Sequence, residues 1–326
     1  MDIRIAKKLF AEELITASEL EKIELGEQDP LSVHWDLRTL LYLGIVLLTT
    51  ATGILVYKNL DTIGHDVIII SIALLSVVCF LYCFKNSTRY SNKKIISVNT
   101  WFDYVLLMGC LLLLSFIGYL QFEYNFFGNQ WGLATFIPMA LLFSTAYYFD
   151  HLGVLSLAIV TLATWVGISV TPLKILKEND FENLRLIYSA LILGTFLIAV
   201  SYASVYKNIK AHFQFTYKNF GINLLLIGLL AAMFHFENYY FLWFLVLAPV
   251  CFLIFKNAIK THSFYFLVIT VLYAYIGLSY VVVRLLTDTD SADFIYPLII
   301  YFILSGIGLI WFFIHYNKIL KKNDGI

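Results

Sequence analysis

The chain has 326 residues, of which 60% are hydrophobic and 13% are charged. Soluble domains contain about 45–50% apolar and about 25% charged residues, so this composition excludes an ordinary soluble fold and predicts an integral membrane protein. The 22 basic and 22 acidic residues cancel, which removes the positive excess expected of a nucleic-acid-binding protein.

Residues 1–38 carry charges throughout and precede the first apolar run. Leu9, Phe10 and Leu14 form an apolar stripe, and Thr16 to Glu19 has the spacing of a capping box, so we expect a short helical cap. A unit this small does not fold alone. Its apolar stripe rests on the membrane surface, on a cytoplasmic loop of its own membrane domain, or on a cytoplasmic protein partner, and these alternatives stay open. The segment lacks the pattern of a cleaved signal peptide.

Ten uncharged apolar runs follow, and each is long enough to cross a bilayer core about 30 Å thick. They lie near Thr39–Tyr57, Val67–Phe84, Tyr104–Leu120, Trp131–Phe149, Leu152–Val170, Leu186–Tyr206, Phe220–Phe234, Tyr239–Phe255, Phe264–Leu286 and Phe294–His315. The predicted fold is all-α: a polytopic helical bundle in the lipid bilayer, with about ten transmembrane helices.

With ten spans, both termini lie on one side of the membrane. Seventeen of the 22 Lys and Arg residues then fall on that side and five on the other. Positive residues accumulate on the cytoplasmic side of membrane proteins. We therefore expect a multi-pass protein with cytoplasmic N- and C-termini, located in a bacterial inner membrane or a plasma membrane.

Two segments align without a gap and indicate an internal duplication. Leu157–Ser169 matches Leu267–Ser279, and Pro138 corresponds to Pro249. The alignment predicts two four-helix repeats in parallel orientation, spans 3–6 and spans 7–10, with chance similarity between apolar helices as the alternative. The expected division is a cytoplasmic helical cap (1–38), two helices with a basic loop (39–100), repeat A (101–210) and repeat B (211–326).

Polar residues gather at the ends of the spans, and no run has an Asp, Glu, Lys or Arg at its centre. Because buried charges mark ion and proton pathways, this argues against an ion pump or proton relay. The candidate outer polar site consists of Gln121, Glu123, Lys174, His235, Glu237 and Arg284. We expect Glu123 and Glu237 to face each other across an outer mouth; the alternative is that these residues contact interfacial water.

Pro138 and Pro249 lie inside spans 4 and 8, where a proline removes a backbone hydrogen bond and bends the helix. Paired breaks point to a binding site, and kinked packing is the alternative. The four cysteines lie in apolar runs, and the sequence has no P-loop, GxGxxG, GxSxG or HExxH motif. We therefore expect no catalytic residues, cofactor or metal, and an enzyme is the least favoured class.

A family resemblance adds to this interpretation. It is carried by Leu14–Thr16 with Ser18–Glu21, a span from Leu43-Gly44 to Gly53, the polar Tyr57–Asn59, and then Gln121, Tyr124, Trp131, Pro138 and Trp165. Over about the first 170 residues this pattern resembles an uncharacterised family of bacterial predicted membrane proteins, domain of unknown function 2157. One departure is Leu60, where the family usually has Trp. The resemblance implies a membrane location and topology, and no particular activity.

Two classes of function follow from these observations. The first is a carrier-like or channel-like protein for a small polar or amphiphilic molecule bound between the two repeats. The second is a non-transporting membrane scaffold or sensor, in which residues 1–38 bind a cytoplasmic partner. A water-accessible cavity near Pro138 and Pro249 would favour the first class, and tight helix packing there would favour the second.

Overall fold

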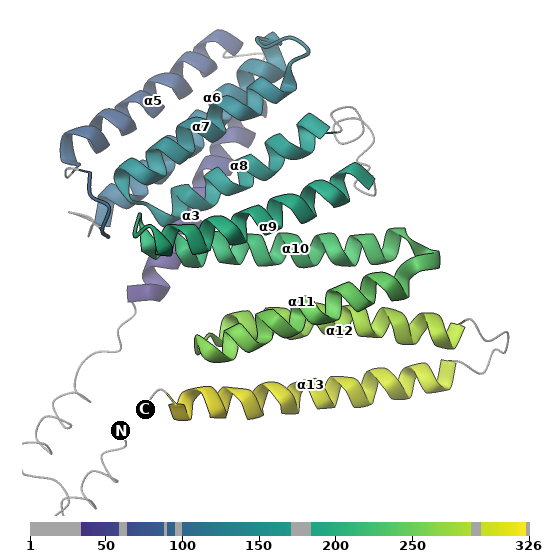
Figure 1. The fold of residues 1–326 in the computed structure, drawn as a ribbon. Coiled ribbons are helices and arrows are strands. Elements are labelled where there is room, and N and C mark those ends of the chain that lie inside the picture. The colour runs from purple at the N-terminus through teal and green to yellow at the C-terminus, as the bar shows by residue number, and fades with distance from the viewer. Residues whose placement is uncertain are drawn as a thin grey trace, which may run out of the picture.

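The computed structural model describes residues 34–58, 64–87, 90–94, 100–170, 184–287 and 295–323. Over these ranges all regular structure is helical (Figure 1). The long helices are α3 (His34–Lys58), α5 (His65–Asn86), α6 (Thr100–Tyr124), α7 (Trp131–Phe149), α8 (Leu152–Val170), α9 (Leu184–Tyr206), α10 (Gln214–His235), α11 (Tyr240–Lys260), α12 (Phe264–Thr287) and α13 (Ile295–Asn323). The cap predicted for residues 1–38 falls outside the described residues as far as residue 33.

Nine helices in the described ranges are long and apolar enough to cross a membrane, and α3 adds a shorter apolar stretch, Thr39–Leu55. Eight of the ten predicted spans fall within one long helix, and the other two, Tyr239–Phe255 and Phe294–His315, begin one residue before α11 and α13. This agreement confirms the predicted polytopic bundle. The differences lie at the ends: α10 begins at Gln214 and α13 continues to Asn323. Hydropathy detects only the part of a helix that suits lipid, whereas backbone hydrogen bonds continue the helix through its polar ends.

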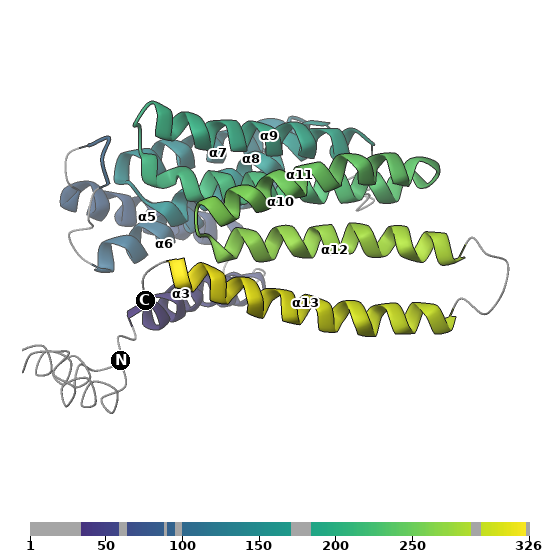
Figure 2. The same ribbon diagram turned by 60° about the horizontal axis from the view of Figure 1, so that its bottom comes forward.

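The helices form an open, layered array (Figures 1 and 2). Consecutive helices pair as hairpins, α5 with α6, α7 with α8, α9 with α10 and α11 with α12; α3 packs on α6, and α13 contacts α12 at one edge. The start of α3 and the end of α13 lie at the same end of the array. We call this the N/C end and the opposite one the distal end.

Two clusters of buried apolar side chains fill the array. The first joins α5 to α9 and is centred on fully buried residues such as Leu106, Leu142 and Leu155. The second joins α10, α11 and α12 around Leu226 and Leu247. Since lipid tails are as apolar as these side chains, close packing rather than removal from water holds such clusters together.

The α9–α10 hairpin is the tightest contact between the clusters, and three glycines allow it. A methyl group on Gly194 would lie 2.7 Å from the backbone nitrogen of Leu225, and one on Gly221 would lie 3.0 Å from the carbonyl oxygen of Gly194. Two turns after Gly221 on α10, a methyl group on Gly228 would lie 3.0 Å from the Leu191 side chain of α9. Small residues at such a crossing let helix backbones approach closely inside a membrane.

Two short turns at the N/C end share one geometry. Asp150 (φ 60°) ends α7, and His262 (φ 51°) occupies the same left-handed position between α11 and α12. The next residue in each turn, His151 or Ser263, donates its N–H to a helix carbonyl five residues back. The turns therefore pair Asp150 with His262 and His151 with Ser263. The repeat as a whole stays a prediction.

Candidate functional site

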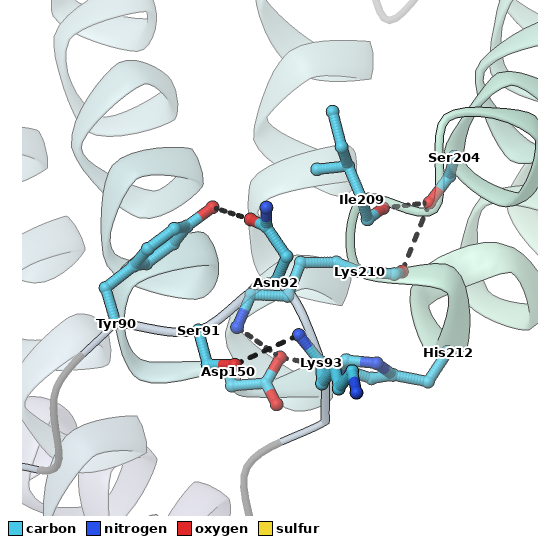
Figure 3. Close-up of polar contacts among 9 residues, drawn as sticks. All are labelled: Tyr90, Ser91, Asn92, Lys93, Asp150, Ser204, Ile209, Lys210 and His212. Atoms are coloured by element: carbon cyan, nitrogen blue, oxygen red, sulfur yellow. Dashed lines mark hydrogen bonds and ion pairs between the residues drawn. The ribbon is translucent and has the colours of Figure 1, made fainter.

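Three loops far apart in the sequence meet at the N/C end (Figure 3). They are residues 90–94 before α6, the turn at Asp150, and residues 207–213 between α9 and α10. The Lys210 N–H donates to the Asn92 carbonyl oxygen at 3.0 Å, which fixes the first loop to the third. The contact with the second loop is ionic.

Asp150 is the centre of this meeting point. Its carboxylate lies 2.9 Å from the Lys210 ammonium and 2.6 Å from Nε2 of His212. The Asp150 side chain is 1% exposed and that of Lys210 is fully buried, whereas His212 is 19% exposed. We call these three residues the Asp150 cluster. Buried charges in such a site depend on one another, because removing one partner leaves the other desolvated and unpaired.

The backbone brings the two main charges together in an unusual conformation. Asp150 and Lys210 both have left-handed φ values, 60° and 49°, a conformation uncommon for residues other than glycine. Ser204 Oγ donates to the carbonyls of Ile209 and Lys210 at 2.7 and 3.1 Å, which folds the loop back on the end of α9. Strained residues of this kind persist only where the surroundings hold them in place.

The loop before α6 covers the cluster. The Tyr90 ring centre lies 5.2 Å from the Lys210 ammonium, within the range of a cation–π contact. The Tyr90 hydroxyl donates to Asn92 Oδ1 at 3.0 Å, and the Lys93 N–H donates to Ser91 Oγ at 3.2 Å. The ionic centre is thus shielded by a segment from the first half of the chain.

A second acidic and basic pair lies nearby. Nε2 of His151 is 3.9 Å from the Asp103 carboxylate, and both residues are buried. Nδ1 of His151 accepts the Val154 N–H at 3.1 Å, so the histidine caps the start of α8. The Tyr42 ring of α3 packs edge-on against both Tyr104 and His151. The Tyr42 ring therefore attaches α3 to this region of the bundle.

At the distal end, the structure places the two predicted carboxylates in separate groups. Glu123 pairs with His65 at 3.3 Å, between α6 and α5. Glu237 pairs with Arg284 at 2.5 Å, and Arg284 also donates to the Tyr280 hydroxyl at 3.1 Å. Each carboxylate is thus next to a basic side chain of its own neighbourhood, which removes the need for a shared cation between them.

The other predicted outer residues have different surroundings. Gln121 is buried and holds the loop after α6, because it donates to Asn125 Oδ1 and the Gly128 carbonyl and accepts the Phe127 N–H. His235 is exposed, with its ring edge-on to Phe236. Lys174 lies outside the described residues.

Both predicted helix breaks lie inside continuous helices, Pro138 in α7 and Pro249 in α11. A shallow, open hollow of about 450 Å³ lies near the start of α7, and its lining does not include Pro138. It is lined by Gln130, Gly132, Leu133, Phe136 and Trp165. The hollow lies on the α7–α8 hairpin and is mainly apolar, so it suits an acyl chain better than a polar solute.

The Asp150 cluster was not predicted from the sequence as a unit. Within residues 104–323, Asp150 is the one acidic residue next to an N/C-end loop, and the loops facing it contain only basic charges. A lone acidic residue facing only basic loops could have predicted that Asp150 pairs with a residue of one of those loops. Among the described residues, no group of three or more His, Cys, Asp or Glu side chains is placed to hold a metal ion.

Comparison with known proteins gives one match. No curated protein and no solved structure matches the chain. The one match is to a protein-family model. It ends within α8, so the matched segment includes Asp150 but neither Lys210 nor His212. The resemblance seen in the sequence is confirmed: residues 7–155 match the family described as "Predicted membrane protein (DUF2157)".

Proposed function

We propose that this protein is a non-transporting membrane scaffold whose loops at the N/C end form one fixed platform. The observation that supports this most strongly is the buried Asp150–Lys210 ion pair. It joins the turn after α7 to the loop after α9, and the Lys210 backbone joins both to the segment before α6. Residues 1–38 would then supply a partner-binding cap.

A carrier would have to open this end of the bundle during its cycle. Such an opening would have to separate Asp150 from Lys210 and so break the contact that holds these two loops together. The glycine contact between α9 and α10 resists sliding, because packed backbones have no space to move into. Both features favour a rigid unit over one that alternates between two open states.

We further propose that the N/C end faces the cytoplasm and that the protein resides in the bacterial inner membrane. Seventeen of the 22 basic residues belong to the side of the termini under the predicted topology. Such an excess is typical of cytoplasmic loops. The platform would therefore be available to cytoplasmic proteins.

Thiol labelling with a membrane-impermeant cationic reagent tests both parts of the proposal. Cys251 is buried two residues after Pro249, and a chain that keeps it as the single cysteine should stay unmodified in permeabilised membranes. In matched chains without native cysteines, Phe126→Cys should react in intact cells and Lys93→Cys only after permeabilisation, since both positions are exposed. Rapid modification of Cys251 would reveal a water-filled path beside Pro249 and would favour a carrier.

A further inference from the structure

A second buried lysine lies at the N/C end, apart from the Asp150 cluster. Lys218 is in the second turn of α10 and is 7% exposed. Its ammonium donates to Asn257 Oδ1 of α11 at 2.6 Å and lies 4.7 Å from the centre of the Phe266 ring of α12. Three helices therefore enclose this one positive charge.

The partners of Lys218 are neutral, in contrast to those of Lys210. In the part of the chain that the structure describes, no carboxylate lies within ion-pair distance of Lys218, whereas Lys210 has Asp150 at 2.9 Å. An ammonium has three donors, and one of them is used by Asn257. Burying a charge without a counter-ion is strongly unfavourable. The Lys218 ammonium therefore has donors left for an anion from outside the chain.

The polar groups beside Lys218 do not supply that anion either. The Tyr265 hydroxyl donates to Asn219 Oδ1 at 2.7 Å, and the Tyr273 hydroxyl donates to Asn223 Oδ1 at 3.2 Å. Asn223 in turn donates to Asn219. This strip along α10 and α12 is hydrogen-bonded within itself and carries no charge.

The surrounding surface is positively charged. From Leu184 to Thr287 the one acidic residue is Glu237, which pairs with Arg284 at the distal end. At the N/C end, Lys207, Lys256 and Lys260 are exposed. Basic surfaces of this kind attract anionic lipids to a membrane protein.

We propose that Lys218 is the centre of a binding site for the phosphate group of an anionic phospholipid. Lys218 lies about 6 Å along α10 from its first residue, at 1.5 Å per residue, so its depth suits the headgroup region of the bilayer. The phosphate would accept hydrogen bonds from the free donors of the ammonium. The inference does not depend on the scaffold proposal, because a carrier would present the same site.

The test compares lipid binding by the whole protein and two matched variants. Purified protein in nanodiscs of phosphatidylcholine is titrated with phosphatidylglycerol, and the bound lipid is counted by native mass spectrometry. Lys218→Gln should bind phosphatidylglycerol about tenfold more weakly or worse, because a charge-assisted hydrogen bond is lost. Lys256→Gln removes the same charge from an exposed position and should change affinity by about twofold or less. Lys218→Arg should retain binding.

Three results would overturn the proposal. The first is equal phosphatidylglycerol binding by the unchanged protein and Lys218→Gln. The second is an equal loss in Lys256→Gln, which would assign the effect to general surface charge. The third is full competition by millimolar inorganic phosphate, which would assign the site to a free anion. Thermal unfolding in phosphatidylcholine alone shows whether Lys218→Gln is folded, and retained binding by Lys218→Arg shows the need for positive charge at this position.

Discussion

Asp150→Asn is expected to lower the free energy of unfolding by about 3–5 kcal/mol, because it leaves the buried Lys210 ammonium without its carboxylate. Both side chains are almost completely removed from solvent. His212 would lose its carboxylate partner at the same time, so the loop between α9 and α10 would lose two contacts in one substitution. Steric trapping in bicelles gives the free energy of unfolding directly.

A matched control and a compensating variant make this prediction specific. Glu237→Gln breaks the Glu237–Arg284 ion pair at the distal end, where the Glu237 side chain is 65% exposed; an exposed pair of this kind contributes about 0–1 kcal/mol. Adding Lys210→Met to Asp150→Asn should recover most of the lost stability, because a neutral pair no longer buries an unpaired charge. Equal effects of Asp150→Asn and Glu237→Gln would contradict the assigned role of the cluster.

Gly194→Ala is expected to destabilise the protein by about 1–3 kcal/mol, and Gly194→Leu by more, because neither side chain fits between α9 and α10. The added methyl group would lie 2.7 Å from the Leu225 nitrogen. Backbone atoms cannot move aside as a flexible side chain can, so the two helices would have to separate. Thermal unfolding in detergent micelles measures the change.

The control for this substitution is a glycine in an open position. An added methyl group on Gly118 of α6 or on Gly306 of α13 would meet no atom within 4 Å. Gly118→Ala and Gly306→Ala should therefore shift stability by no more than about 1 kcal/mol, toward higher stability where helix propensity dominates. A loss at Gly118 equal to that at Gly194 would mean that the effect comes from glycine replacement in general.

The sequence predicted the helices well because each span is a local property. A run such as Trp131–Phe149 is uninterrupted, apolar and bounded by polar residues, and the helix α7 has those same bounds. The predicted span began only at Phe220, because a search for apolar runs stops at polar residues such as Lys218 and Asn219, whereas α10 begins at Gln214. Their side chains bind Asn257 and Tyr265 of neighbouring helices, so they belong to the helix.

The Asp150 cluster could not be predicted in the same way, because it is a non-local property. Asp150 and Lys210 are separated by two long helices, and they meet only because both turns adopt left-handed backbone conformations. The sequence of each loop on its own is typical of a polar connection between two transmembrane helices. The distal residues illustrate the same limit: Glu237 and Arg284 were both candidates, but they pair because the fold brings the turn after α10 next to the end of α12. Ligand binding by the outer residues stays a prediction.

The central claim is that the N/C-end loops form a single fixed platform, and the distance between two of these loops tests it most directly. Lys93 and Lys207 are exposed residues of the first and third loops, and nitroxide labels on Lys93→Cys and Lys207→Cys report that distance by pulsed electron spin resonance in lipid bilayers. The account predicts one narrow distance distribution, which broadens when Asp150→Asn is added. Two well-separated populations in the protein with an intact cluster would show that this end opens, and would contradict the account.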